Sequence, residues 1–113
     1  MDPVEARRLA QAGEVVLVDV RNPDEWHRTG VGEGAVPISM QDPAFLDKLM
    51  EALGGDAGRP VAVICAAGGR SAQVAAALRA RGFGTVHNVA EGMMGSAAGP
   101  GWLGRGLPVT PWA

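Results

Sequence analysis

The sequence predicts a single α/β domain spanning residues 1–113, with a mainly parallel central sheet of about four to five strands and helices on both faces. Short runs of consecutive apolar residues are typical of strands buried on both faces of a parallel sheet. Helical patterns lie between these runs, and strands that alternate with helices favour the α/β class. The chain has 113 residues, of which 47% are hydrophobic, so it can bury a core without disulfides.

The first half of the chain begins with a predicted helix that ends near Gly13. Asp2 can cap this helix, Pro3 suits its first position, and Glu5 would complete a capping box. Residues 15–20, Val-Val-Leu-Val-Asp-Val, are predicted as a buried strand. The other predicted elements of this half are a helical turn at residues 24–26, a loop at 30–34 and a short edge strand at 35–38.

The second half repeats the alternation of helix and strand. Asp42-Pro43 is a further cap-then-proline signal, and a helix with one apolar face is expected behind it, ending at Gly54-Gly55. The later predicted elements are a buried strand at residues 60–65, a helix at 71–81 with Val74 and Leu78 pointing inward, a strand at 85–89, and a Gly- and Pro-rich tail with one helical turn around Trp102.

Composition and charge argue against several classes of function. A net charge of −2 gives no reason to expect nucleic acid or an anionic membrane as a partner, and no apolar run approaches the length of a membrane span. The charged N-terminal segment does not resemble a signal peptide. The single cysteine excludes an intramolecular disulfide and a cysteine-rich metal site, and a lone thiol suits a reducing compartment, so we expect a cytoplasmic protein.

That cysteine, Cys65, ends the predicted strand 60–65, and ligands bind outside the carboxyl ends of strands in open α/β sheets. Six residues from Cys65 to Arg70 are expected before the helix that Ser71 caps or opens. A glycine-rich loop, a helix N-terminus and the Arg70 charge all favour an anion in the loop. Such settings lower a cysteine pKa to about 3.5–7.5. Two alternatives stay open: Cys65 as a buried, inert residue, and Arg70 as a solvated residue or one paired with an acid.

Three charged residues are expected at the same edge of the sheet. Asp19 and Arg21 end the first strand and could shape the site, although a structural pairing of Arg21 with Glu25 or Asp24 is favoured. Glu91 follows the last strand and could form a wall of the site.

The sequence resembles the single-domain rhodanese family of sulfurtransferases along nearly its whole length. The segments that carry the resemblance are VLVDVRNPDEW, GVGEGAVPIS, CAAGGRS, RGFGTVHNVAEGM and GWLGRGLPV. The resemblance implies a rhodanese-like domain and a thiosulfate sulfurtransferase with Cys65 as nucleophile and persulfide carrier. It also implies that the persulfide is held by the loop residues Ala66, Ala67, Gly68, Gly69, Arg70 and Ser71.

In that interpretation Arg70 helps to bind a small anionic donor such as thiosulfate, and a thiol, a protein or cyanide accepts the sulfur. No cofactor or metal is implied, and the oligomeric state is not determined by the sequence. Three other functions stay open: a sulfur-relay or binding module with low turnover, a cysteine-based phosphatase or arsenate reductase, and a redox sensor. The phosphatase is disfavoured because only four residues separate Cys65 from Arg70, whereas those enzymes have five. The redox sensor would need an external thiol, because the chain has no second cysteine.

Overall fold

The computed structural model describes residues 1–113 and confirms the α/β prediction. Its main sheet is entirely parallel and has the strand order β3-β1-β4-β5. The four strands are β1 (Val16–Asp19), β3 (Val36–Pro37), β4 (Val61–Ile64) and β5 (Val86–Asn88). The predicted edge position of the proline-containing strand is correct, because β3 pairs only with β1.

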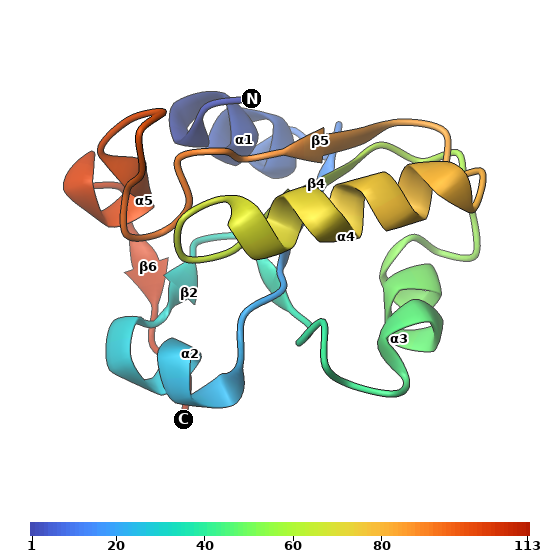
Figure 1. Cartoon of the computed structure of the whole chain (residues 1–113), viewed down its shortest axis with the longest axis horizontal. Coiled ribbons are helices and arrows are strands. Elements are labelled where there is room, and N and C mark those ends of the chain that lie inside the picture. Colours follow the sequence, from blue (N-terminus) through green and yellow to red (C-terminus); the bar gives the residue numbers. More distant parts are fainter.

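Five helices flank the sheet on both faces. They are α1 (Pro3–Gln11), α2 (Pro23–Thr29), α3 (Phe45–Ala52), α4 (Gly69–Ala80) and α5 (Gly101–Gly104). In Figure 1, α4 crosses in front of the strands, whereas α1 and α5 lie together at the upper left. None of these helices has the length and apolar character that crossing a membrane requires.

Two hydrophobic clusters cover the two faces of the sheet. Alternate residues of β1 and β4 point to opposite sides: Val18 and Val63 join the α3 and α4 side, whereas Leu17 joins the α1 and α5 side. Trp102 of α5 is fully buried in the second cluster. The central strands are therefore buried on both faces, as their apolar runs predict.

Strand register brings the predicted site residues to one edge. Asp19 pairs with Ile64 in the parallel ladder between β1 and β4, so the residues that follow both strands emerge side by side. Cys65 directly follows Ile64, and Arg21 follows β1 by two residues. The carboxyl edge of the sheet is thus the expected place for a site.

Several local predictions are wrong or incomplete. The predicted loop 30–34 and the tail contain β2 (Val31–Gly32) and β6 (Val109–Thr110), which form a separate antiparallel pair. The helical turn at residues 24–26 belongs to the first half of the longer helix α2, which Pro23 opens. The third helix begins at Phe45, because the Asp42 carboxylate caps a preceding turn by accepting from the Ala44 N–H.

The expected capping box of α1 is only half formed. The Asp2 carboxylate accepts from the Glu5 N–H at 2.8 Å, as predicted. The Glu5 carboxylate instead pairs with Arg8 at 2.7 Å, because an arginine three residues along the helix lies within its reach.

Gly32 of β2 lies directly against the buried Trp102 ring, and this contact yields a stability prediction. A methyl group at Gly32 would lie 2.8 Å from two ring carbons of Trp102. We expect Gly32→Ala to lower the free energy of unfolding by about 1–3 kcal/mol, since overpacking forces neighbours to move. Urea denaturation followed by circular dichroism measures the change.

Gly69→Ala is the matched control, because a methyl group there meets no atom within 4 Å and the residue opens α4. This control should not destabilise the protein. A Gly32→Ala variant as stable as the parent chain would contradict the packing assigned to Trp102.

Candidate functional site

Cys65 lies at the start of a short loop between β4 and α4, where the sequence places it. Helix α4 begins at Gly69, two residues earlier than predicted, so the loop is shorter than expected and Arg70 and Ser71 belong to the first helical turn. The cysteine is free and only 1% exposed. The early start of α4 brings the positive end of the helix closer to the sulfur than the sequence suggests.

The Cys65 sulfur is surrounded by hydrogen-bond donors. It accepts from the Gly68 N–H at 3.1 Å and from the Ser71 hydroxyl at 3.3 Å. Burial is the largest single effect on the thiol and raises its pKa, but it is outweighed by hydrogen bonds from the Ser71 hydroxyl and from the backbone N–H groups of Ser71, Ala67 and Gly68. The net result is a Cys65 pKa below its ordinary value, which favours the thiolate.

The loop keeps its shape through contacts with the segment that follows β5. Gly68 has a left-handed backbone with φ 90°, and a methyl group on it would lie 2.3 Å from the Ala90 carbonyl oxygen. The Asn88 amide donates to the Gly68 carbonyl at 3.3 Å. Asn88 was not predicted as a site residue; a polar residue at the end of β5, on the carboxyl edge, is the signal that could have identified it.

The same segment after β5 also makes backbone hydrogen bonds to the Cys65 loop. The Met93 N–H donates to the Cys65 carbonyl at 2.8 Å, and the Met94 N–H donates to the Ala66 carbonyl at 2.9 Å. Gly92 lies so close to the loop that a methyl group on it would be 2.3 Å from the Ala66 oxygen. These contacts place the Cys65 loop between α4 and residues 92–94.

Arg70 forms an ion pair with Glu25 of α2, which is one of the two alternatives that the sequence leaves open. Its two terminal nitrogens donate to the two carboxylate oxygens at 2.7 and 2.8 Å. This pairing lowers the pKa of Glu25 and is the largest of the effects that raise the pKa of Arg70. The charge of a Cys65 thiolate also raises the pKa of Arg70, and this effect is smaller than that of the Glu25 pairing.

The predicted pairing of Arg21 with Glu25 or Asp24 is wrong. Arg21 instead pairs with Asp19, with distances of 2.9 to 3.1 Å, and both side chains are fully buried. Arg21 also donates to the Gly30 carbonyl at 3.1 Å, which joins the end of β1 to the end of α2. Glu25 is therefore free to pair with Arg70.

Glu91 is buried at the carboxyl edge, but its side chain faces α5. Its carboxylate accepts from Arg105 at 2.7 and 2.8 Å and from the Gly101 N–H at 3.0 Å. The Arg105 hydrogen bond lowers the pKa of Glu91. None of the hydrogen bonds made by this carboxylate reaches the Cys65 loop.

A polar cavity of about 280 Å³ lies beside the Arg70–Glu25 pair, and we name it the α2 cavity. Its lining residues are Arg21, Glu25, Arg28, Thr29 and Met94. Met94 neighbours the Cys65 loop through its bond to Ala66. Both arginines of this cavity already have acidic partners, Arg21 with Asp19 and Arg28 with Asp24.

The arrangement can stabilise one negative charge at Cys65 and supply a nucleophilic sulfur. Backbone and hydroxyl donors stabilise the anion, and no general base is needed where the pKa of the thiol is lowered in this way. The same donors could hold an added sulfur atom that carries the charge.

Comparisons with known proteins point to one family. The family model of the rhodanese-like domain matches residues 2–98. A sulfurtransferase from Allochromatium vinosum is 33% identical over 105 residues, covering 92% of this chain and 86% of its own length.

Solved structures show the same fold. The polysulfide-sulfur transferase homodimer of Wolinella succinogenes has a TM-score of 0.75 and 31% identity, with 97% of this chain and 76% of that chain covered. A human single-domain sulfurtransferase has a TM-score of 0.63 and 25% identity, with 81% of this chain and 88% of that chain covered. These relatives support sulfur transfer as the general activity. The family match over most of the chain, together with the relative that is 33% identical, shows that the protein belongs to the rhodanese-like domain family.

Proposed function

We propose that this protein transfers a sulfane sulfur from thiosulfate to a thiol acceptor through a persulfide on Cys65. The observation that carries the proposal is the ring of donors around the Cys65 sulfur, which favours the thiolate and suits a persulfide anion equally well. Relatives with sulfurtransferase activity support the reaction class. We choose thiosulfate as the donor because it is a small anion, which is the kind of molecule that the loop and Arg70 would bind.

The proposed reaction has two balanced halves. The Cys65 thiolate attacks the outer sulfur of thiosulfate, a new sulfur–sulfur bond forms, and the old one breaks with its electron pair leaving on sulfite. The negative charge then lies on the outer sulfur of the persulfide, within reach of the loop N–H groups. An acceptor thiolate, or cyanide in the test tube, takes that outer sulfur and restores the Cys65 thiolate.

Arg70, which lies beside the α2 cavity, would guide the donor. Arg70 is 35% exposed and Glu25 is 15% exposed, so an incoming dianion can reach the guanidinium and compete with the carboxylate. Asp19, Arg21 and Glu91 act in this proposal as structural supports of the edge rather than as contacts to the donor. A reducing, cytoplasmic compartment fits the need to keep the single thiol free.

A sulfur-relay protein with low turnover is the second candidate. Both terminal nitrogens of Arg70 are occupied by Glu25, so a free donor must displace a bidentate partner before it binds. A relay protein that receives sulfur from another protein would not need that displacement. Fast single loading of Cys65 combined with slow multiple turnover would favour the relay.

We expect Ser71→Ala to raise the pKa of Cys65, because the variant lacks the hydroxyl that donates to the sulfur. At neutral pH a smaller fraction of the thiol is then ionised, so alkylation by iodoacetamide slows. The pH dependence of the alkylation rate gives the pKa, and Ser71→Thr, which retains a hydroxyl, is the control. An unchanged profile in the alanine variant would show that Ser71 does not stabilise the thiolate.

Incubation with thiosulfate should add one sulfur atom to the protein, and cyanide should remove it. Intact-mass spectrometry measures both steps, and Cys65→Ser is the control that should take up no sulfur. An unmodified mass at saturating thiosulfate would reject thiosulfate as donor. Uptake by the serine variant would reject Cys65 as the carrier.

We expect Arg70→Ala to raise the KM for thiosulfate about two- to tenfold, since a partly exposed charge–charge contact is lost. The rate at which a preformed persulfide reacts with cyanide should change much less. Steady-state and single-turnover assays separate the two, with Arg8→Ala on the surface of α1 as the control. A defect confined to the cyanide step would contradict the donor-binding role.

A further inference from the structure

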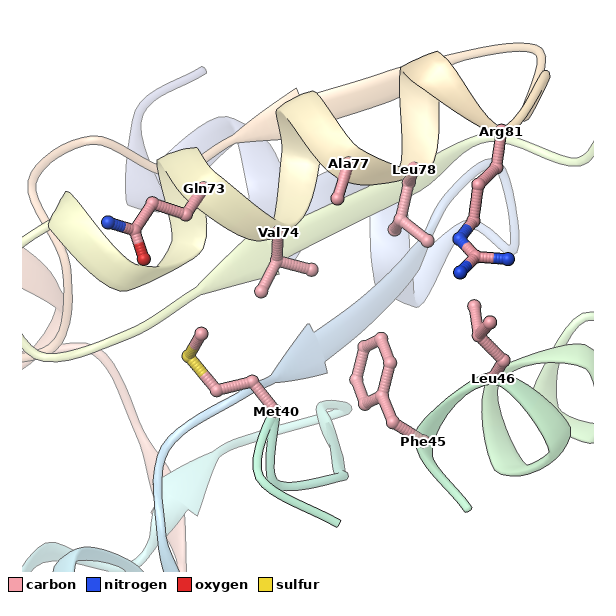
Figure 2. Close-up of a pocket in the computed structure, with 8 residues that line it drawn as sticks. All are labelled: Met40, Phe45, Leu46, Gln73, Val74, Ala77, Leu78 and Arg81. Carbon is pink, nitrogen blue, oxygen red and sulfur yellow. The ribbon is translucent and has the colours of Figure 1, made fainter. Parts of the chain in front are cut away.

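A second concave surface lies along α4 and begins one helical turn beyond Arg70, and we name it the α4 groove. Its lining residues are Met40, Phe45, Leu46, Gln73, Val74, Ala77, Leu78 and Arg81. Figure 2 shows side chains from α4 above the groove and those of Met40, Phe45 and Leu46 below it. The volume is about 360 Å³, within the range of roughly 300–1,000 Å³ typical of small-molecule sites.

The groove is apolar along its length. Val74 and Leu78 are buried core residues that form one side. Met40, Phe45 and Leu46 are only half-buried, although they pack against the same core. Apolar surface therefore remains in contact with water between α4 and the start of α3, and a suitable molecule would gain free energy by covering it.

One end of the groove carries a cation without an acidic partner. Seven of the ten lysine and arginine residues of the chain form ion pairs, and Arg81 is not among them. Its side chain also makes no hydrogen bond within the chain. Figure 2 shows the guanidinium beside Leu46, with the Gln73 amide at the opposite end.

We propose that the α4 groove binds a small amphiphilic carboxylate, with its aliphatic chain along the apolar walls and its carboxylate on Arg81. The eight-residue separation of Gln73 and Arg81 along a helix corresponds to about 12 Å, which suits a linear chain of roughly eight to ten carbon atoms. Charge complementarity selects an anion, because Arg81 is the only charged residue that lines the groove. This site is separate from the Cys65 loop and does not depend on the proposed sulfur transfer.

The test is a titration of the full chain, labelled with ¹³C at the methionine methyl groups, with octanoate. The Met40 methyl should shift, because it lines the groove. The Met93 methyl should not shift, because Met93 is buried on the other face of the sheet. Met94 lines the α2 cavity and reports binding there instead. A shift of Met94 without one of Met40 would overturn the proposal.

The second measurement is isothermal titration calorimetry, in which the charge and the chain length of the ligand are varied. Each added methylene from hexanoate to octanoate should raise affinity up to about fourfold. Arg81→Gln should weaken octanoate binding about two- to fivefold, as expected for an exposed ion pair. Octylamine should bind more weakly than octanoate, and equal or stronger binding of the amine would reject the role of Arg81.

Matched variants of α4 locate the site. Ala77→Glu places a carboxylate in the groove and should reduce octanoate affinity at least tenfold, whereas Ala76→Glu, an equally exposed position outside the groove, should not. Sulfur uptake from thiosulfate, where the parent chain shows it, serves only to confirm that both variants are folded. Equal losses in both variants would overturn the proposal.

A second copy of the chain is the competing occupant of this groove. Light scattering over a range of concentrations measures the molecular mass, and the Met40 methyl signal is followed across the same range. A dimer that broadens or shifts the Met40 signal without octanoate, and that Ala77→Glu dissociates, would show that the groove is an interface and would overturn the carboxylate site.

Discussion

The turn at Gly68 is the constraint on which the site depends. The chain leaves β4 and enters α4 within a few residues, which requires the left-handed backbone at Gly68 and the absence of a side chain where it meets Ala90. This turn directs the Gly68 N–H toward Cys65 and brings Ser71 within 3.3 Å of the sulfur. The loop is therefore shaped by its contact with the segment after β5 as much as by its own residues.

Three ion pairs tie the carboxyl edge of the sheet to its surroundings. Burying Asp19 and Arg21 is tolerable only because each neutralises the other and Arg21 has a carbonyl partner at Gly30. Glu25 and Arg70 connect α2 with α4, and Glu91 and Arg105 connect the segment after β5 with the end of α5. The edge that holds Cys65 is consequently cross-linked on several sides, which keeps the donors of the loop in place.

The sequence predicts the features whose causes are local. The apolar runs at residues 15–20 and 60–65 predict buried strands. The position of Cys65 at the end of the second run predicts its place at the carboxyl edge of the sheet. The pair β2 and β6 has no such signal, because two residues cannot show a period and the partners lie far apart in the chain.

The choice of partner in an ion pair also depends on residues that are distant in sequence. Glu25 lies close in sequence to Arg21, which suggests that these two residues pair. In the fold, Glu25 pairs with Arg70 instead, and Arg21 pairs with Asp19. Glu91 likewise follows β5 at the correct edge, but its partner Arg105 comes from the tail. Sequence alone places such residues at an edge of the sheet, whereas only the three-dimensional structure decides which charges meet.

Helix α4 connects the Cys65 loop with the α4 groove through one row of side chains. Ser71, Val74 and Leu78 are spaced by three and four residues, so they lie on the same buried face of the helix. The first of them contacts the Cys65 sulfur, and the other two line the α4 groove. Ala77 and Arg81 lie at the exposed border of that face. A molecule that fills the α4 groove would therefore contact Val74, which lies one helical turn from Ser71.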